Sequence, residues 1–220
     1  MTETQAREEI CRVGKSLFDR GYVHATAGNI SMRLDDGSFL ITPTDACLGF
    51  LDPAALAHVD ATGTQLGGDK ASKTLALHRA IYGAATAFDP QTRCVIHTHS
   101  THCVTLTLKD AGEELLAPLT PYFVMKVGRV PVIRYHRPGA PAAADEVART
   151  ITQYGARGTP IRAVMLARLG PNVWHQSPAA AMATLEELEE TARLALQAGD
   201  VQPLTEPQID ELRRAFGARW

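Results

Sequence analysis

Apolar residues recur at helical spacing in several long segments of the chain. In residues 4–20, Ile10, Val13 and Leu17 would share one face of a helix that Gly21 ends. The same spacing predicts four further helices, over residues 72–85, 100–108, 142–153 and 178–198. In residues 178–198, Leu185, Leu188, Ala192 and Leu196 lie on one face, so this helix is expected to close the core.

Short apolar runs between turn residues predict the strands. The hairpin turn signal Asp35-Asp36-Gly37 separates two of them. The expected strands are residues 31–34, 39–42, 56–59, 94–99, 130–135 and 161–167. Helices alternate with strands, but some strands pair as hairpins, so we expect an α/β protein whose mixed or largely antiparallel sheet is covered by helices. No linker is visible, which predicts a single domain over residues 1–220.

Composition narrows the functional class. The chain has 220 residues, of which 45% are hydrophobic and 21% charged, as in an ordinary globular protein. Its net charge of −2 argues against a nucleic-acid partner. No apolar run approaches the roughly 20 residues that cross a bilayer, so no membrane partner is expected. The polar N-terminus is unlike a signal peptide, and the cysteines form no CxxC pair, so we expect reduced thiols in a cytoplasmic protein.

The sharpest local signal is His97-Thr98-His99 at the end of a predicted strand. Side chains alternate along a strand, so the two imidazoles would point the same way and could bind one divalent metal ion. Two polar residues at a strand end, without a metal, remain the alternative. His102 is expected on the following helix, as a buried polar residue rather than a ligand.

Three polar turns point to an anion site. Gly28-Asn29-Ile30-Ser31 offers backbone N–H groups and short polar side chains, which suit a phosphate or a carboxylate. Thr42-Pro43-Thr44-Asp45 is a polar turn after a strand. Residues 68–74 place two lysines and Ser72, the expected N-cap, at a helix start, where an anion is favoured. The alternative for these lysines is a solvated surface turn.

Together and in this order, these signals resemble the class II aldolase/adducin family. The family pattern is a Gly-Asn-x-Ser turn, a Thr-Pro-x turn, a Lys-x-Ser-x-Glu helix start and a His-x-His after an apolar strand. Within the family, the chain is most similar to the branch of 3-oxo-tetronate 4-phosphate decarboxylases. The stretches that carry this closer likeness are residues 68–73, 119–125, 137–139 and 185–192.

The resemblance implies a three-layer α/β/α sandwich around a mainly antiparallel sheet, and a homotetramer with active sites between subunits. It also implies a zinc-like divalent metal ion and a lyase that converts a phosphorylated four-carbon 3-oxo sugar acid to dihydroxyacetone phosphate and CO₂. An aldolase or epimerase acting on a sugar phosphate remains an alternative. A non-catalytic member of the fold, which binds a ligand or a partner protein, is the third hypothesis.

The resemblance also assigns residues. His97 and His99 would hold the metal. The residues expected around the substrate phosphate are Asn29, Thr44, Lys70 and Ser72. Lys73 is a second cation there, and either Lys70 or Lys73 could instead hold the substrate carboxylate. Tyr122 is a candidate proton donor acting across a subunit boundary.

Two positions depart from the family pattern. Thr74 stands where the family has a metal-linked Glu, and Leu169 stands where it has a third His. Substitute ligands could come from His102, His136 or His175. Decarboxylation of a 3-oxo acid removes no carbon-bound proton. The absence of the Glu at position 74 should therefore slow a decarboxylation less than it would slow an aldol reaction. This reasoning favours the decarboxylase.

Overall fold

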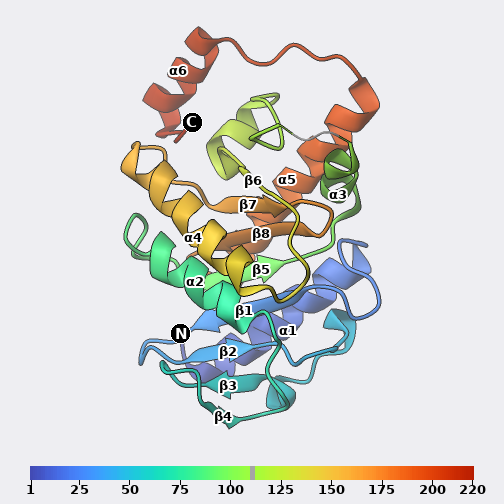
Figure 1. Cartoon of the computed structure of the whole chain (residues 1–220), viewed down its shortest axis with the longest axis vertical. Coiled ribbons are helices and arrows are strands. Elements are labelled where there is room, and N and C mark those ends of the chain that lie inside the picture. Colours follow the sequence, from blue (N-terminus) through green and yellow to red (C-terminus); the bar gives the residue numbers. More distant parts are fainter. Residues whose placement is uncertain (110–111) are drawn as a thin grey trace.

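An eight-stranded sheet runs through the molecule, and helices cover both of its faces (Figure 1). The computed structural model describes residues 1–109 and 112–220. The strands lie in the order β4-β3-β2-β1-β5-β8-β7-β6, and neighbours are antiparallel except for β6 and β7. The expected three-layer arrangement around a mainly antiparallel sheet is confirmed.

The strands are β1 (Asn29–Arg33), β2 (Phe39–Ile41), β3 (Ala57–Val59), β4 (Gln65–Gly67), β5 (Cys94–His97), β6 (Val132–Ile133), β7 (Ala163–Leu166) and β8 (Gly170–His175). The helices are α1 (Glu3–Asp19), α2 (Leu75–Ala85), α3 (Thr101–Leu108), α4 (Pro141–Ala156), α5 (Pro178–Ala198) and α6 (Glu206–Phe216). A π-helical turn spans Phe123–Val127, and short 3₁₀ turns span Leu48–Phe50 and Pro53–Ala55.

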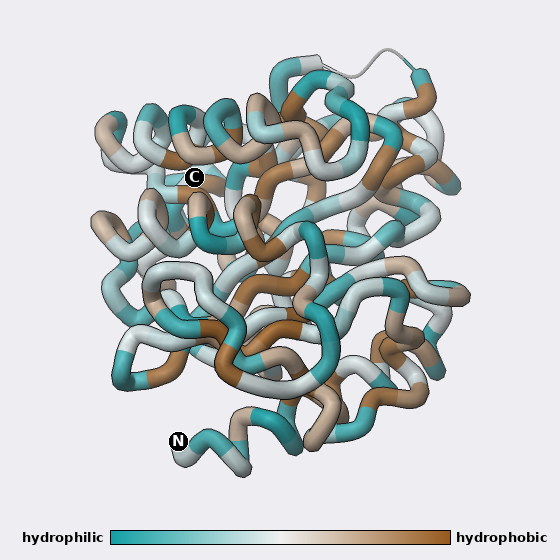
Figure 2. Tube along the Cα trace, turned by 60° about the horizontal axis from the view of Figure 1, so that its bottom comes forward, coloured by the Kyte–Doolittle hydropathy of each residue, from teal (hydrophilic) through white to brown (hydrophobic). Residues whose placement is uncertain are grey.

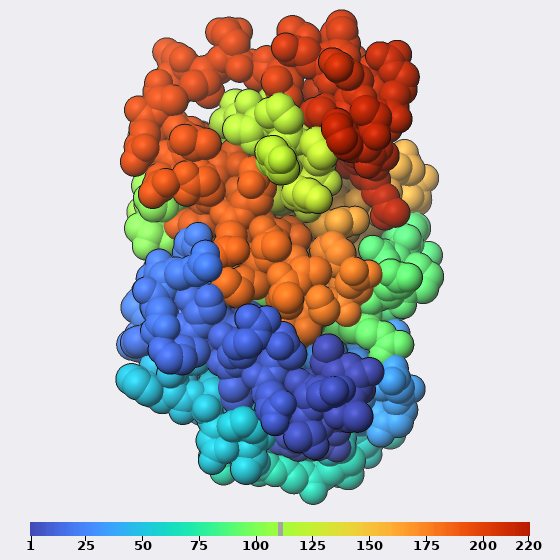
Figure 3. Space-filling view, turned by 180° about the vertical axis from the view of Figure 1, so that it is seen from behind, coloured from blue at the N-terminus to red at the C-terminus, as the bar shows by residue number. Residues whose placement is uncertain are grey.

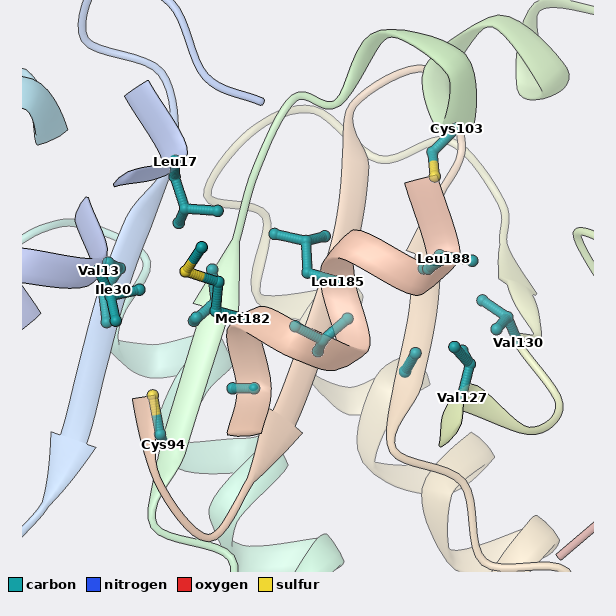
Figure 4. Close-up of a cluster of buried hydrophobic side chains, with 14 of the residues drawn as sticks. Val13, Leu17, Ile30, Cys94, Cys103, Val127, Val130, Met182, Leu185 and Leu188 are labelled. Atoms are coloured by element: carbon teal, nitrogen blue, oxygen red, sulfur yellow. The ribbon is translucent and has the colours of Figure 1, made fainter. Parts of the chain in front are cut away.

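Helices α1 and α5 cover one face of the sheet, which is the face seen in Figure 3. The larger hydrophobic core lies beneath them, because apolar positions of β1 and β5 meet the inward sides of both helices (Figure 4). Members of this core include Val13, Leu17, Ile30, Met182, Leu185 and Leu188. Figure 2 shows the hydrophobic positions gathered on the central strands between the helix layers.

Helices α2 and α4 pack against each other over the opposite face. Their smaller core is built from Ile81 and Tyr82 of α2, Val147 and Ile151 of α4, and inward residues of the strands, such as Trp174. Both helices begin near the same end of the sheet (Figure 1). This arrangement leaves space over the ends of β1 and β5, where the polar turns lie.

Several element boundaries differ from the sequence predictions. β4, β8 and α6 were not predicted, and β1 already begins at Asn29, inside the expected turn. α2 begins at Leu75 with Thr74 at its N-cap position, so the assignment of Ser72 as N-cap was wrong. β5 ends at His97 rather than His99, because the backbone leaves the ladder there. None of the helices in the described ranges has both the length and the hydropathy needed to span a membrane.

Candidate active site

A pocket of about 640 Å³ opens where α2 and α4 both begin. The start of β1, the end of β5 and the connection between β6 and α4 form its other walls. Seven of the residues predicted for the site line it: Asn29, Thr44, Ser72, Lys73, Thr74, His97 and His99. The chain therefore gathers in one cavity motifs that lie up to 70 positions apart in the sequence, from 29 to 99.

The imidazoles of His97 and His99 lie together, with ring centroids 5.0 Å apart and planes at 67°. Strand alternation does not explain this, since β5 ends at His97. His99 lies in the irregular segment that follows the strand, where the buried hydroxyls of Thr98 and Ser100 hydrogen-bond to each other at 2.5 Å. The predicted pairing is thus found, but by a different local structure.

Two glycines let the neighbouring strands approach this segment closely. A Cβ on Gly170, at the start of β8, would lie 1.9 Å from the carbonyl oxygen of Thr98. A Cβ on Gly28, next to β1, would lie 2.9 Å from the carbonyl oxygen of His97, and its φ of +86° also favours glycine. Both glycines therefore help to hold the histidine pair in place.

The histidine pair is neutral and oriented. The His97 ring donates its Nδ1–H to the carbonyl oxygen of Pro171 at 2.9 Å, which leaves Nε2 as a lone-pair donor. Burial lowers the pKa of His97 to about 3, and the nearby His99 adds to this shift. Burial also lowers the pKa of His99, with a smaller effect from His24, whose ring centroid lies 6.4 Å away. Neutral imidazoles in this state are ready to bind a metal ion.

Two imidazoles fit part of a metal shell. Rings that share one tetrahedral ion at a metal–nitrogen distance of about 2.1 Å hold their centroids about 5 Å apart, as His97 and His99 do. Within residues 1–109 and 112–220, however, no group of three His, Cys, Asp or Glu side chains is placed to hold a metal. Thr74 and Leu169, the two departures from the family pattern, both line the pocket.

The proposed substitute ligands do not complete the shell. His102 donates from Nδ1 to Glu189 at 2.8 Å, and neither it nor His175 lines the pocket. His136 does line it, but its Nε2 is hydrogen-bonded to Glu146 at 2.8 Å. His24, beside His99, was missed, although its place four residues before Gly28 was visible in the sequence.

Hydroxyls and one lysine form the wall at the start of α2. The Ser72 and Thr74 hydroxyls are 2.9 Å apart, and no side chain caps the helix that follows. Lys73 lies between them in the sequence and faces the pocket. This combination of hydroxyls, a cation and unpaired helix N–H groups suits an anion.

Two predicted site residues lie outside the pocket. Lys70 is exposed and does not line it, although its carbonyl oxygen accepts the Thr44 N–H at 2.8 Å. Tyr122 is 61% exposed and also lies outside the lining. The sequence reasoning instead missed Arg134 and Arg137, which reach the pocket from the connection between β6 and α4.

A buried polar row lies beneath the pocket. Asn29, His97 and Asn172 are paired across β1, β5 and β8, so their side chains share the face under α2 and α4. Among the residues that the structure describes, Asn29 Oδ1 and both amide atoms of Asn172 have no hydrogen-bond partner, nor does Nε2 of the fully buried His78. His78 bonds through Nδ1 to Ser31 at 2.7 Å, and burial lowers its pKa to about 3.

Comparison with known proteins places this geometry in a family. A protein named 3-oxo-tetronate 4-phosphate decarboxylase from Cupriavidus necator is 52% identical over 227 residues, which cover 100% of this chain and 99% of the relative. A protein of the same name from Escherichia coli K12 is 40% identical over 215 residues, covering 96% of each.

Comparison with solved structures supports the same family. The crystal structure of YgbL from Klebsiella pneumoniae matches with a TM-score of 0.85 and 41% identity, over 97% of this chain and 100% of that one. The family model for the Class II Aldolase and Adducin N-terminal domain matches residues 8–196. By its sequence and its fold, the chain belongs to the class II aldolase/adducin family.

Proposed function

We propose that this chain decarboxylates 3-oxo-tetronate 4-phosphate, releasing CO₂ and dihydroxyacetone phosphate. The observation that carries the proposal is one pocket that combines a neutral imidazole pair with a basic, hydroxyl-lined helix start. The Cupriavidus necator relative, which bears this activity in its name, supports the choice of substrate. The reaction makes the protein a carbon–carbon lyase.

Dependence on a divalent metal ion is typical of the family, and we propose that His97 and His99 hold the ion. Zinc is the proposed metal, because neutral imidazole nitrogens are among its usual ligands. When bound, the ion would supply a Lewis acid that draws electron density from the substrate ketone. The hydrogen bond from His97 to the Pro171 carbonyl oxygen orients this imidazole, so that its other ring nitrogen, Nε2, would be free to bind the ion.

The wall at the start of α2 is the proposed phosphate site. Lys73 supplies a positive charge, Ser72 and Thr74 supply hydroxyls, and the first turn of α2 has N–H groups that no side chain caps. Asn29 faces the same cavity with an unpaired amide oxygen. These groups would anchor the phosphate on C4 and so place the ketone on C3 near the imidazoles.

Decarboxylation requires little acid–base chemistry from the protein. The electron pair of the C1–C2 bond moves toward the ketone as CO₂ leaves, and C2 then takes up one proton. No proton is removed from carbon, so the hydroxyl of Thr74 suffices where an aldolase would need a carboxylate. This is the reason to prefer the decarboxylase over the aldolase.

A homotetramer is also proposed, on the family resemblance. Tyr122 is exposed and does not line the pocket of its own chain, so it can serve as a proton donor only in the pocket of another copy. Light scattering of the purified protein measures its mass in solution, and a monomer would remove Tyr122 from the mechanism.

The function is tested by supplying 3-oxo-tetronate 4-phosphate to the zinc-loaded protein and measuring CO₂ and dihydroxyacetone phosphate. Equal amounts of the two products are expected. His99→Ala should lose this activity, while His102→Gln and His175→Gln, at histidines outside the pocket, are the matched controls. Cleavage of a ketose phosphate without release of CO₂ would replace the proposal with the aldolase.

A further inference from the structure

The pocket has a second basic wall, apart in sequence from the start of α2. Arg134, His136 and Arg137 line it from the connection between β6 and α4. β6 lies at the edge of the sheet, but the connection runs back across the front of the molecule to the start of α4 (Figure 1). Since α4 packs beside α2 and both helices begin at the pocket, the two basic walls share one cavity.

An ion-pair cluster fixes the shape of this wall. Glu146 of α4 accepts from the His136 ring at 2.8 Å and from Nε of Arg134 at 3.2 Å. The side chains of Glu146 and His136 are only 20% and 16% exposed, so this part of the wall is held firmly. Neighbouring His136 and Arg134 lower the pKa of Glu146 against the opposing effect of burial, which keeps its carboxylate charged.

Arg137 differs from its two neighbours. Within the described ranges it forms no ion pair with a carboxylate, yet it lines the cavity. Asp45 and Asp145 also line the pocket, but among the described residues neither forms an ion pair with Arg137, whereas Arg134 is already paired with Glu146. The charge of Arg137 is therefore available to a ligand.

We propose that Arg137, supported by Arg134 and His136, binds the carboxylate of the substrate, while Lys73 and the start of α2 bind its phosphate. This inference rests on the proposed function. The substrate carries one anionic group at each end, and the pocket presents one basic wall for each. A guanidinium matches a carboxylate through two parallel hydrogen bonds, so this wall would select acid phosphates over ketose phosphates that lack the carboxylate.

The chemistry predicts which kinetic constant depends on Arg137. The carboxylate is charged in the bound substrate but becomes neutral CO₂ as the C1–C2 bond breaks. Contact with Arg137 is therefore strongest before the transition state, so losing it should raise KM far more than it lowers kcat. A residue that only maintained the fold would not produce this separation.

The binding test uses two probes and needs no turnover. Dihydroxyacetone phosphate carries the phosphate alone, whereas erythronate 4-phosphate also carries the carboxylate but has no ketone and so does not lose CO₂. Titration calorimetry on Arg137→Ala should show erythronate 4-phosphate bound about tenfold more weakly, with dihydroxyacetone phosphate unchanged. Lys73→Ala should weaken both probes. Arg137→Lys should recover part of the loss, since it keeps the charge without the planar fork.

The control is Arg149→Ala, which removes an exposed arginine of α4 outside the pocket and should change neither affinity. Equal weakening of both probes by Arg137→Ala would assign Arg137 to the phosphate, and no weakening of either would remove it from the site; both results overturn the inference. Failure of the unmodified protein to bind either probe would instead count against the proposed function.

Discussion

On the face of the sheet under α1 and α5, the buried carboxylate of Glu189 has hydrogen-bond partners, whereas on the face under α2 and α4 several buried polar atoms have none among the described residues. Glu189 of α5 accepts the N–H groups of His102 and Cys103 at 2.9 and 3.0 Å, which caps the start of α3. Side chains also cap α1 and α5, but none caps α2 or α4. The buried side-chain amide of Asn172 has no hydrogen-bond partner within residues 1–109 and 112–220.

This difference separates stability from function. A buried polar group without a partner costs about 1–3 kcal/mol, so an unsatisfied row is retained only where it serves a purpose. The α1/α5 face carries the larger apolar core and supplies much of the folding free energy. The α2/α4 face has less of this stabilisation, because polar groups near the pocket lack hydrogen-bond partners among the described residues and the first turns of α2 and α4 have no side-chain cap. Substitutions on the α1/α5 face should therefore lower the free energy of unfolding but not turnover, whereas substitutions on the α2/α4 face should lower turnover but not stability.

The largest effect is expected from His97→Ala on the α2/α4 face. It removes one of two adjacent imidazoles, so turnover should fall at least about 1,000-fold, which is about 4 kcal/mol of activation free energy. Equilibrium dialysis should show the loss of bound metal, and circular dichroism should show an unchanged fold. Full activity of His97→Ala combined with His99→Ala would exclude a metal-dependent mechanism.

Leu185→Ala, on the α1/α5 face, should do the reverse. Leu185 is fully buried in the larger core, so removing its three outer side-chain carbons should lower the free energy of unfolding by about 2–5 kcal/mol. Turnover per folded molecule should stay unchanged, as measured below the onset of unfolding. A loss of turnover without a loss of stability would show that the two faces are not separable in this way.

Acid should destabilise the α2/α4 face through His78. Its pKa is about 3 in the folded protein and about 6.5 in the unfolded chain, so unfolding takes up a proton between these values. The stability contributed by neutral His78 is fully present above pH 6.5 and is lost as the pH falls toward 3, by about 1.4 kcal/mol per pH unit.

His78→Asn keeps a side chain that can hydrogen-bond to Ser31 but does not titrate. Urea titrations between pH 6 and pH 4 should then show a shallower loss of stability than in the unmodified protein. Parallel curves for the two proteins would mean that His78 is protonated in the folded state or that the unfolded chain does not protonate it.

Asn172→Leu tests whether the unsatisfied row serves function. Leucine has a similar shape and no polar atoms, so the free energy of unfolding should stay level or rise by about 1 kcal/mol, while turnover falls. Denaturation and steady-state kinetics on one preparation measure both quantities. A loss of more than about 2 kcal/mol of stability would indicate that the Asn172 amide is hydrogen-bonded after all.

The smallest effect is expected from Thr74→Ala, which removes a hydroxyl 2.9 Å from that of Ser72. If no carboxylate is needed at this position, kcat should fall by about tenfold or less, which is about 1.4 kcal/mol. Loss of all activity would give Thr74 a direct role and would reopen the aldolase hypothesis.

Local sequence pattern was enough to predict much of the fold and part of the pocket. The helical spacing identified α1, α2 and α5, because each has an apolar face that is visible without knowing its partner; α3 and α4 were also predicted as helices. The polar turns and the histidine pair were visible for a similar reason, since each lies in one short segment.

Only the tertiary structure decided the features that depend on contacts between distant segments, such as strand β8 and the arginines of the pocket. β8 begins Gly170-Pro171-Asn172, which does not look like a strand, and it is stabilised by pairing with β5 and β7 on its two sides. Arg134 and Arg137 enter the pocket because α4 packs beside α2 and draws their connection back over the sheet. The packing of whole elements also leaves Tyr122 and Lys70 outside the pocket lining. Chain segments distant in sequence meet through the packing of whole elements, which no local pattern encodes.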